Sequence, residues 1–229
     1  MDINRLFKNP FSAAHITHPK IFKFGEDHIQ RLNANNVAAD LADTITATTN
    51  LFDDFAAALS VEDKSFIRQQ ALTQTMNETL VDFKNEIRRE EGLVRSIWSA
   101  NSPVYKEFFP RGITEYNSAK LSNAEVLMSR FVATATDYVA TLGQPFVDKF
   151  TQLQTTFVDA RKAQLQQFGE VAEAKSATRE KRQVLETQLV QNIYTLGMKY
   201  PANPDRGKDF FDMSILRRPK RVKNEAGEV

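Results

Sequence analysis

The sequence contains no cysteine in 229 residues. Disulfides, cysteine-ligated zinc, iron–sulfur clusters and thiol catalysis are therefore excluded. Glycine and proline are also scarce, at 8 residues each, which is too few for the closely spaced turns of a β-sandwich or β-barrel. These absences favour a helical protein.

An excess of charge of one sign and long apolar runs are missing as well. The 30 basic and 29 acidic side chains leave a formal net charge of +1, so no overall field attracts nucleic acid or an acidic membrane surface. No run of 18 apolar residues occurs, which predicts that no helix spans a membrane. The first 20 residues lack an apolar stretch of signal-peptide length, and we expect a cytoplasmic protein.

Apolar residues recur at alternating spacings of three and four in the segments 41–59 and 76–97. This spacing is typical of helices packed nearly parallel or antiparallel to their neighbours. Ser60, followed by two acids, is typical of a helix N-terminus. The pattern predicts a break at Ser60 and an antiparallel helical hairpin over residues 26–100.

A second hairpin is predicted over residues 122–200, after a connector at 101–121 with one short helical turn. The apolar spacing resumes in phase after Gly143–Gln144–Pro145, which indicates a kinked helix rather than a reversal. Gly169 is the expected turn between the two helices of this hairpin.

The predicted fold is all-α, an elongated antiparallel four-helix bundle over residues 26–200. An N-terminal arm at 1–25 precedes it, and a C-terminal extension with a basic tail at 201–229 follows. The arm carries several phenylalanines, so we expect it to pack onto the bundle.

One phrase occurs twice, in Leu93–Phe109 and in Leu189–Phe211. Both copies open Leu-Val-x-x-Ile plus an aromatic residue, pass through proline and close on Lys, an acid and Phe-Phe. Two duplicated hairpins would explain the repetition, and coincidence is the alternative, because the copies align only with a six-residue insertion. Packing or assembly roles are predicted for the aromatic residues of these phrases and of the arm: Phe7, Phe11, Trp98, Phe108, Phe109, Tyr194, Phe210 and Phe211.

Candidate catalytic and metal-binding motifs are nearly absent. His15 and His18 are spaced so that they could share a metal, but they lie in a proline-bearing arm without a nearby glutamate. No G-x-S-x-G, G-x-G-x-x-G, P-loop or Glu-x-x-His motif occurs. We therefore predict no catalytic residues, no metal site and no cofactor.

The strongest local charge lies in the C-terminal stretch "RRPKRVK". Such a run could bind nucleic acid or another anionic partner, and the alternative is a solvated tail that maintains solubility. The basic residues of this stretch are Arg217, Arg218, Lys220, Arg221 and Lys223.

Function can be predicted only by class. Threonine and glutamine crowd the polar positions of residues 44–50, 73–79 and 151–156, and low-charge helix faces suit side-by-side assembly, although they also suit solvent. The leading prediction is a non-enzymatic structural or scaffolding protein, a homo-oligomer or part of a multi-copy particle. The alternatives are a nucleic-acid-binding module that uses the basic tail and a membrane-active helical protein.

Overall fold

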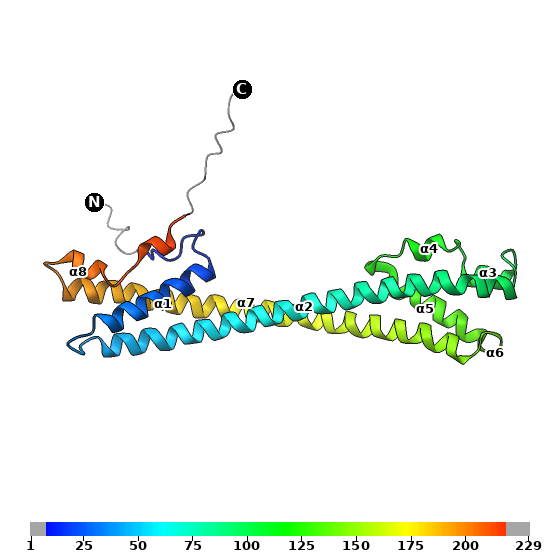
Figure 1. Ribbon diagram of the computed structural model, residues 1–229, viewed down its shortest axis with the longest axis horizontal. Helices are drawn as coiled ribbons and strands as arrows, with labels where there is room; N and C mark the ends of the chain where they lie inside the picture. The colour runs from blue at the N-terminus through cyan, green and yellow to red at the C-terminus, as the bar shows by residue number, and fades with distance from the viewer. Residues whose placement is uncertain (1–7, 219–229) are drawn as a thin grey trace, which may run out of the picture. The chain divides into compact units, whose positions relative to one another are not determined.

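The structure is a computed structural model that describes residues 8–218, in which every regular element is helical (Figure 1). The predicted all-α class is therefore confirmed. The helices are α1 (His18–Ala34), α2 (Ala42–Ile97), α3 (Pro103–Phe108), α4 (Thr114–Asn117), α5 (Leu121–Asp137), α6 (Val139–Leu142), α7 (Gln144–Lys199), α8 (Pro204–Lys208) and the 3₁₀ helix η2 (Met213–Leu216).

The chain divides into two compact units. Unit 1 contains residues 8–63 and 172–218 of the described chain, and unit 2 is Lys64–Val171. The two long helices, α2 and α7, contribute to both units. Unit 1 adds α1, α8 and η2 to them, whereas unit 2 adds α3, α4, α5 and α6.

Within each unit the segments of α2 and α7 run antiparallel. In unit 1, Lys181 Nζ donates to Asp54 Oδ2 at 2.7 Å, and Asn192 Nδ2 donates to Thr48 Oγ1 at 2.8 Å. As the residue number rises on α7, the number of its partner on α2 falls. Unit 2 shows the same order, from the pair Lys149–Glu90 to the pair Gln164–Thr73.

Most of the predicted packing residues lie in the cores of the two units. Phe108 and Phe109 are buried in unit 2, and Phe11 and Phe210 are buried in unit 1. The remaining ones are Trp98 and Phe211, which are partly buried against these cores, Tyr194, which is 43% exposed, and Phe7, which lies outside the described residues.

The predicted break at Ser60 and the predicted turn at Gly169 are wrong. Both α2 and α7 are unbroken helices of 56 residues. A serine followed by acids is tolerated inside a helix, and a helical glycine costs only about 1 kcal/mol. Continuous packing between the two long helices outweighs both local signals.

The true reversals lie elsewhere. The chain turns between α1 and α2, after Ala34, and α1 begins at His18, inside the predicted arm at 1–25 and before the predicted start of the bundle at residue 26. The apolar spacing predicts a kinked helix at Gly143, but the chain reverses there. Gly143 allows this turn because its φ of 83° lies in the left-handed region that favours glycine. Beyond it α7 returns along α5, with the Phe131 and Phe150 rings 4.4 Å apart.

The corrected hairpins, α1–α2 and α5–α7, match each other closely. α1 and α5 each have 17 residues, and α5 begins 103 residues after α1, at Leu121 against His18. α2 and α7 each have 56 residues, and α7 begins 102 residues after α2, at Gln144 against Ala42. With the 103-residue offset the buried positions of α1, Ile21, Phe24, Gly25, His28 and Leu32, correspond one by one to those of α5, Ala124, Leu127, Met128, Phe131 and Ala135.

The offset of 102 residues shows which part of the repeated phrase corresponds to the structural repeat. The Phe-Phe pairs Phe108–Phe109 and Phe210–Phe211 are 102 residues apart and close the two cores. The Leu-Val-x-x-Ile parts are only 96 residues apart, at Leu93 and Leu189. Leu93 is 42% exposed whereas Leu189 is buried, so this part of the match is not structural.

Two glycines should respond in opposite directions to alanine. A Cβ at Gly25 would lie 2.8 Å from Phe52 Cδ2, and the Phe52 ring is held by Phe22 at 5.0 Å. A Cβ at Gly169 meets nothing within 4 Å. We expect Gly25→Ala to destabilise the fold by about 1–3 kcal/mol through overpacking, and Gly169→Ala to stabilise it by about 1 kcal/mol through helix propensity. Urea denaturation of both variants tests this pair, and equal shifts of the same sign would contradict it.

Candidate functional site

The first candidate site is in unit 2, where α2 and α7 pack against each other through a seam rich in polar residues. The seam of α7 contains the buried Gln164 and Gln167, and Ser65 and Gln69 face them from α2 as half-buried residues. Gln164 Nε2 donates to Thr73 Oγ1 at 2.7 Å, but Gln167 Nε2 is buried without a partner. A seam of this composition contributes little apolar burial.

Large apolar side chains lie beside this seam and face outward. Phe66 is 44% exposed, Leu165 is 55% exposed and Phe168 is 48% exposed. Each of the three comes one position after a residue of the seam, namely Ser65, Gln164 or Gln167. In a pair of antiparallel helices, the residues that come one position after the facing residues lie on the same side of the pair. We call this side the Phe66–Phe168 surface: Phe66, Gln70, Thr73, Leu165 and Phe168.

A shallow groove extends the Phe66–Phe168 surface along α2. Its volume is about 490 Å³, and only its last lining residue, Glu78, is charged. The low-charge stretch 73–79 noted in the sequence supplies much of this groove. The lining residues are Phe66, Gln69, Gln70, Thr73, Gln74, Asn77 and Glu78.

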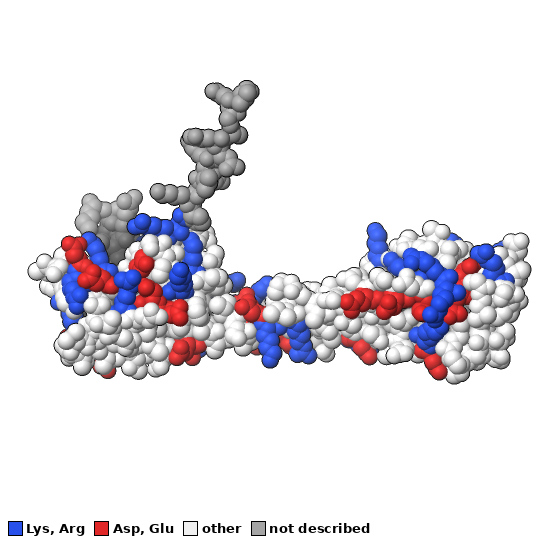
Figure 2. Space-filling view, viewed as in Figure 1, with Lys and Arg blue, Asp and Glu red and all other residues white. Residues whose placement is uncertain are grey.

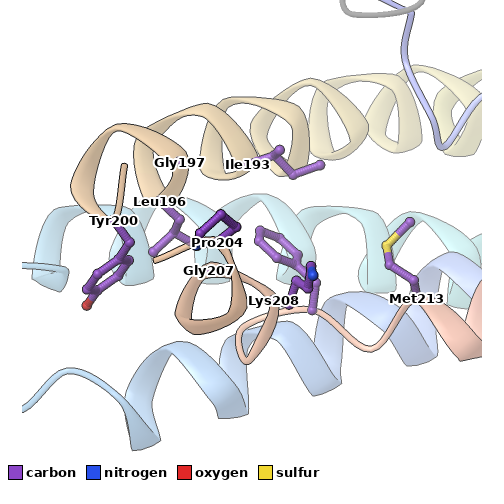
Figure 3. Close-up of a pocket in the computed structure, with 9 residues that line it drawn as sticks. Ile193, Leu196, Gly197, Tyr200, Pro204, Gly207, Lys208 and Met213 are labelled. Atoms are coloured by element: carbon purple, nitrogen blue, oxygen red, sulfur yellow. The ribbon is translucent and has the colours of Figure 1, made fainter. Parts of the chain in front are cut away.

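The second candidate site is an apolar pocket of about 310 Å³ in unit 1, between the end of α7 and the segment that contains α8 and η2. Figure 3 shows Leu196 projecting from α7 to lie beside Pro204. The lining residues are Ile193, Leu196, Gly197, Tyr200, Pro204, Gly207, Lys208, Phe211 and Met213. Eight of these nine fall within the second copy of the repeated phrase, 189–211.

The charged group of this pocket is Lys208. Its side chain is 75% exposed and pairs with Asp205 at 2.8 Å. The hydrogen bond with Asp205 raises the pKa of Lys208, and the same bond lowers the pKa of Asp205. An exposed pair of this kind is weak, so the ammonium group remains charged and can change partners.

A buried polar network lies close to the core of unit 1. His28 is fully buried, and its Nδ1 donates to the carbonyl oxygen of Phe210 at 2.7 Å. Asn192 Nδ2 donates to His28 Nε2 at 3.0 Å and to Thr48 Oγ1 at 2.8 Å. Burial lowers the pKa of His28 to about 4 against the opposing effect of the hydrogen bond to Phe210. The ring is therefore neutral near pH 7, and its position in the core gives it a structural role.

The two histidines considered as metal ligands, His15 and His18, belong to no group of three possible ligands in the described residues. The His18 ring lies 5.9 Å from the Phe55 ring, and burial together with Arg182 lowers the pKa of His18. Within residues 8–218, no three histidine, aspartate or glutamate side chains are grouped so that they could hold a metal ion.

The basic tail is only partly described. Arg217 and Arg218 are exposed, and the backbone carbonyl of Arg217 accepts a hydrogen bond from Lys20 Nζ at 2.8 Å. The other three predicted residues, Lys220, Arg221 and Lys223, lie outside the described residues. On the visible face of unit 1, basic and acidic side chains are intermixed over α1 and α8 (Figure 2).

The comparisons with known proteins give no match: no family model, no curated protein and no solved structure resembles the chain significantly. None of the helices in residues 8–218 combines the length and apolarity needed to traverse a bilayer.

Sequence reasoning missed both candidate sites. The Phe66–Phe168 surface could have been found by asking which residues lie beside a seam that contains Ser65, Gln69 and Gln164. The pocket could not, because its walls come from two segments that only the fold brings together.

Proposed function

We propose that the protein is a non-enzymatic structural subunit that associates with further copies of itself through the Phe66–Phe168 surface. The observation that carries this proposal is the inverted polarity of one stretch of unit 2, residues 65–73 of α2 and 164–168 of α7. Glutamines occupy the seam between the helices, while Phe66, Leu165 and Phe168 point outward. A second copy that covered these side chains would bury their apolar surface, which remains exposed in a single chain.

The low charge of the surface favours a second copy of the chain as the partner. The charged residue nearest to it on the same face of α7 is Arg161, four residues before Leu165, and its Nη1 donates to Gln164 Oε1 at 2.8 Å. A twofold contact places a patch against the same patch, so like charges would oppose each other. Gln70 and Thr73 carry no charge, and the side-chain amide of Gln70 can exchange hydrogen bonds with its own counterpart.

The expected affinity is modest. Completing the burial of three half-exposed side chains contributes roughly 1 kcal/mol each, or about 6 kcal/mol for two copies. Association costs at least about 4 kcal/mol in lost freedom. The surface therefore supports reversible association rather than an obligate dimer.

Sedimentation velocity over about 5–500 μM protein tests the proposal, a range that covers weak association. We expect the wild-type chain to associate reversibly as its concentration rises. The double variant Phe66→Ser/Phe168→Ser should associate at least tenfold more weakly, because it removes about 1.4 kcal/mol or more of interface energy. Val126→Ser is the matched control, since Val126 is 70% exposed on α5 of the same unit. A wild-type monomer at every concentration, or equal association of the double variant, would overturn the proposal.

The two alternative functions stay predictions. For the basic tail, truncation after Leu216 should abolish retention of DNA or RNA, and binding by the full chain should weaken steeply with salt. For membrane activity, the full chain should release dye from anionic vesicles. Absence of either effect in the full chain would remove the corresponding alternative.

A further inference from the structure

We infer that the apolar pocket of unit 1 is a docking site for a phenylalanine side chain presented by a segment of a partner protein. The inference starts from the correspondence between the two units and does not depend on assembly through the Phe66–Phe168 surface. Because α7 repeats α2 at an offset of 102 residues, each pocket residue of α7 has a counterpart in unit 2.

In unit 2 the corresponding place is filled by the chain itself. The Tyr105 ring lies 5.0 Å from the Phe109 ring, and its hydroxyl donates to Glu91 Oε1 at 2.5 Å. Arg95 Nη2 donates to the same carboxylate oxygen at 2.5 Å. Tyr105 is only 8% exposed. An aromatic side chain thus completes the wall that Glu91, Arg95 and Phe109 form.

The counterparts of these wall residues line the pocket in unit 1. At the 102-residue offset, Glu91 corresponds to Ile193, Arg95 to Gly197 and Phe109 to Phe211. All three of these counterparts line the pocket. The walls of the Tyr105 site are therefore present in unit 1, with smaller or more apolar residues.

The filling residue is missing in unit 1. Ser102 Oγ caps α3 by accepting from Tyr105 N at 3.1 Å, and Asn203 Oδ1 caps α8 by accepting from Arg206 N at 3.1 Å. Counted from the caps, Arg206 is the counterpart of Tyr105, and its guanidinium lies over the Phe210 ring at 5.8 Å. Counted from the Phe-Phe pairs, the counterpart is Gly207, which has no side chain. In both alignments no aromatic residue of α8 enters the pocket, and the space that Tyr105 fills in unit 2 stays empty in unit 1.

The walls specify the occupant. A volume of about 310 Å³ exceeds the cavity of roughly 150 Å³ that holds a benzene ring in an apolar core. Ile193 replaces the acceptor Glu91, so a tyrosine hydroxyl would lose its partner, which costs about 1–3 kcal/mol. Phenylalanine is therefore favoured over tyrosine by about tenfold or more.

The mouth of the pocket indicates what surrounds that phenylalanine. Lys208 and Met213 line the pocket and are both exposed to solvent, the Lys208 side chain by 75% and Met213 by 43%. The exposed ammonium group of Lys208 complements an acidic residue beside the phenylalanine. Methionine adapts to varied peptide surfaces. A protein segment is the favoured source because the counterpart in unit 2 is a side chain on the first turn of a helix.

Binding can be measured on the full chain with a defined probe. The probe is the acetylated, amidated peptide Ser-Pro-Asp-Phe-Glu-Glu-Gly, with tyrosine and alanine versions, and toluene as a small-molecule arm. Methyl NMR follows Ile193 and Met213 in the pocket, with Met76 and Met128 in the unit 2 core as internal controls. We expect saturable shifts of the pocket methyls with the phenylalanine peptide, about tenfold weaker binding of the tyrosine peptide, and none of the alanine peptide.

Three variants make the test specific. Gly207→Tyr should fill the pocket and abolish peptide binding, whereas Gly92→Tyr, at an exposed site on α2, should not. A Cβ meets nothing within 4 Å at either glycine. Ile193→Glu restores the acceptor found in unit 2 and should shift the preference toward tyrosine by about tenfold. Unchanged methyl signals of Ile21 and Leu185, in the core of unit 1, show that the two pocket variants are folded, and unchanged Met76 and Met128 signals show the same for Gly92→Tyr in unit 2.

The outcomes are decisive. Failure of the phenylalanine peptide to bind at millimolar concentration, undiminished binding by Gly207→Tyr, or saturation by toluene without any peptide binding would each overturn the inference. A tyrosine preference in the wild-type chain would overturn it as well.

Discussion

Replacing Phe131 by alanine is expected to lower the free energy of unfolding of unit 2 by about 3–5 kcal/mol. Phe131 is 1% exposed and projects from α5 into the centre of the core. Six aromatic rings lie 4.4 to 6.2 Å from it, centroid to centroid. Alanine would lose the transfer energy of the ring and leave a cavity that rigid aromatic neighbours cannot close.

Urea denaturation followed by tryptophan fluorescence measures this effect, because Trp98, the single tryptophan of the chain, packs on Phe108 in the same unit. Val126→Ala on α5 is the control. Its side chain is 70% exposed, so the change should stay within about 0.5 kcal/mol. A loss below about 1 kcal/mol for Phe131→Ala would show that α5 does not close this core.

The second large effect is a loss of stability of unit 1 in mild acid. The pKa of His28 is about 4 in the folded chain, against the ordinary histidine value of about 6.5 in the unfolded chain. Between these values the unfolded chain binds a proton that the folded chain does not, so the free energy of unfolding falls as the pH falls from about 6.5 to 4. Well above pH 6.5 His28 does not affect the free energy of unfolding. The total loss of unfolding free energy below that pH is about 3 kcal/mol.

His28→Gln isolates this contribution. The charged neighbours Asp27 and Arg31 act on the ring in opposite directions, so burial remains the dominant cause. We expect the difference in unfolding free energy between pH 7.5 and pH 4.5 to shrink by about 2–3 kcal/mol in the variant. Asn192→Ala is the control, because it removes a hydrogen-bond partner and keeps the titrating ring. An unchanged pH difference in His28→Gln would show that the ring is protonated in the folded chain.

The helical class was readable from the sequence. The scarcity of glycine and proline and the three-four spacing of apolar residues predict helices. Periodicity works here because buried positions repeat with the helical turn wherever a helix meets a core.

The positions of the turns were not readable. Ser60 has the sequence of a helix start and Gly169 that of a turn, yet both lie inside 56-residue helices. Local signals of about 1 kcal/mol cannot compete with packing along a whole helix. At Gly143 the apolar spacing continues in phase on both sides, so periodicity alone cannot distinguish a reversal from a kink.

The candidate sites depend on relations between distant residues. The Phe66–Phe168 surface requires knowing which residues of α2 face α7. The pocket is recognised only when Ile193, Gly197 and Phe211 are compared with Glu91, Arg95 and Phe109 at the 102-residue offset. The repeated phrase pointed to a repeat, but its Leu-Val-x-x-Ile part suggested an offset six residues too small.

Disulfide crosslinking of single-cysteine variants tests the proposed assembly most directly, because the chain has no cysteine of its own. One cysteine would be placed in turn at Gln70, at Leu165 or at Phe168, with Val126→Cys as the control. On mild oxidation we expect crosslinked dimers from at least one position on the Phe66–Phe168 surface and only background from the control. Crosslinking at the Val126 position alone, or at none of the four, would contradict association through this surface.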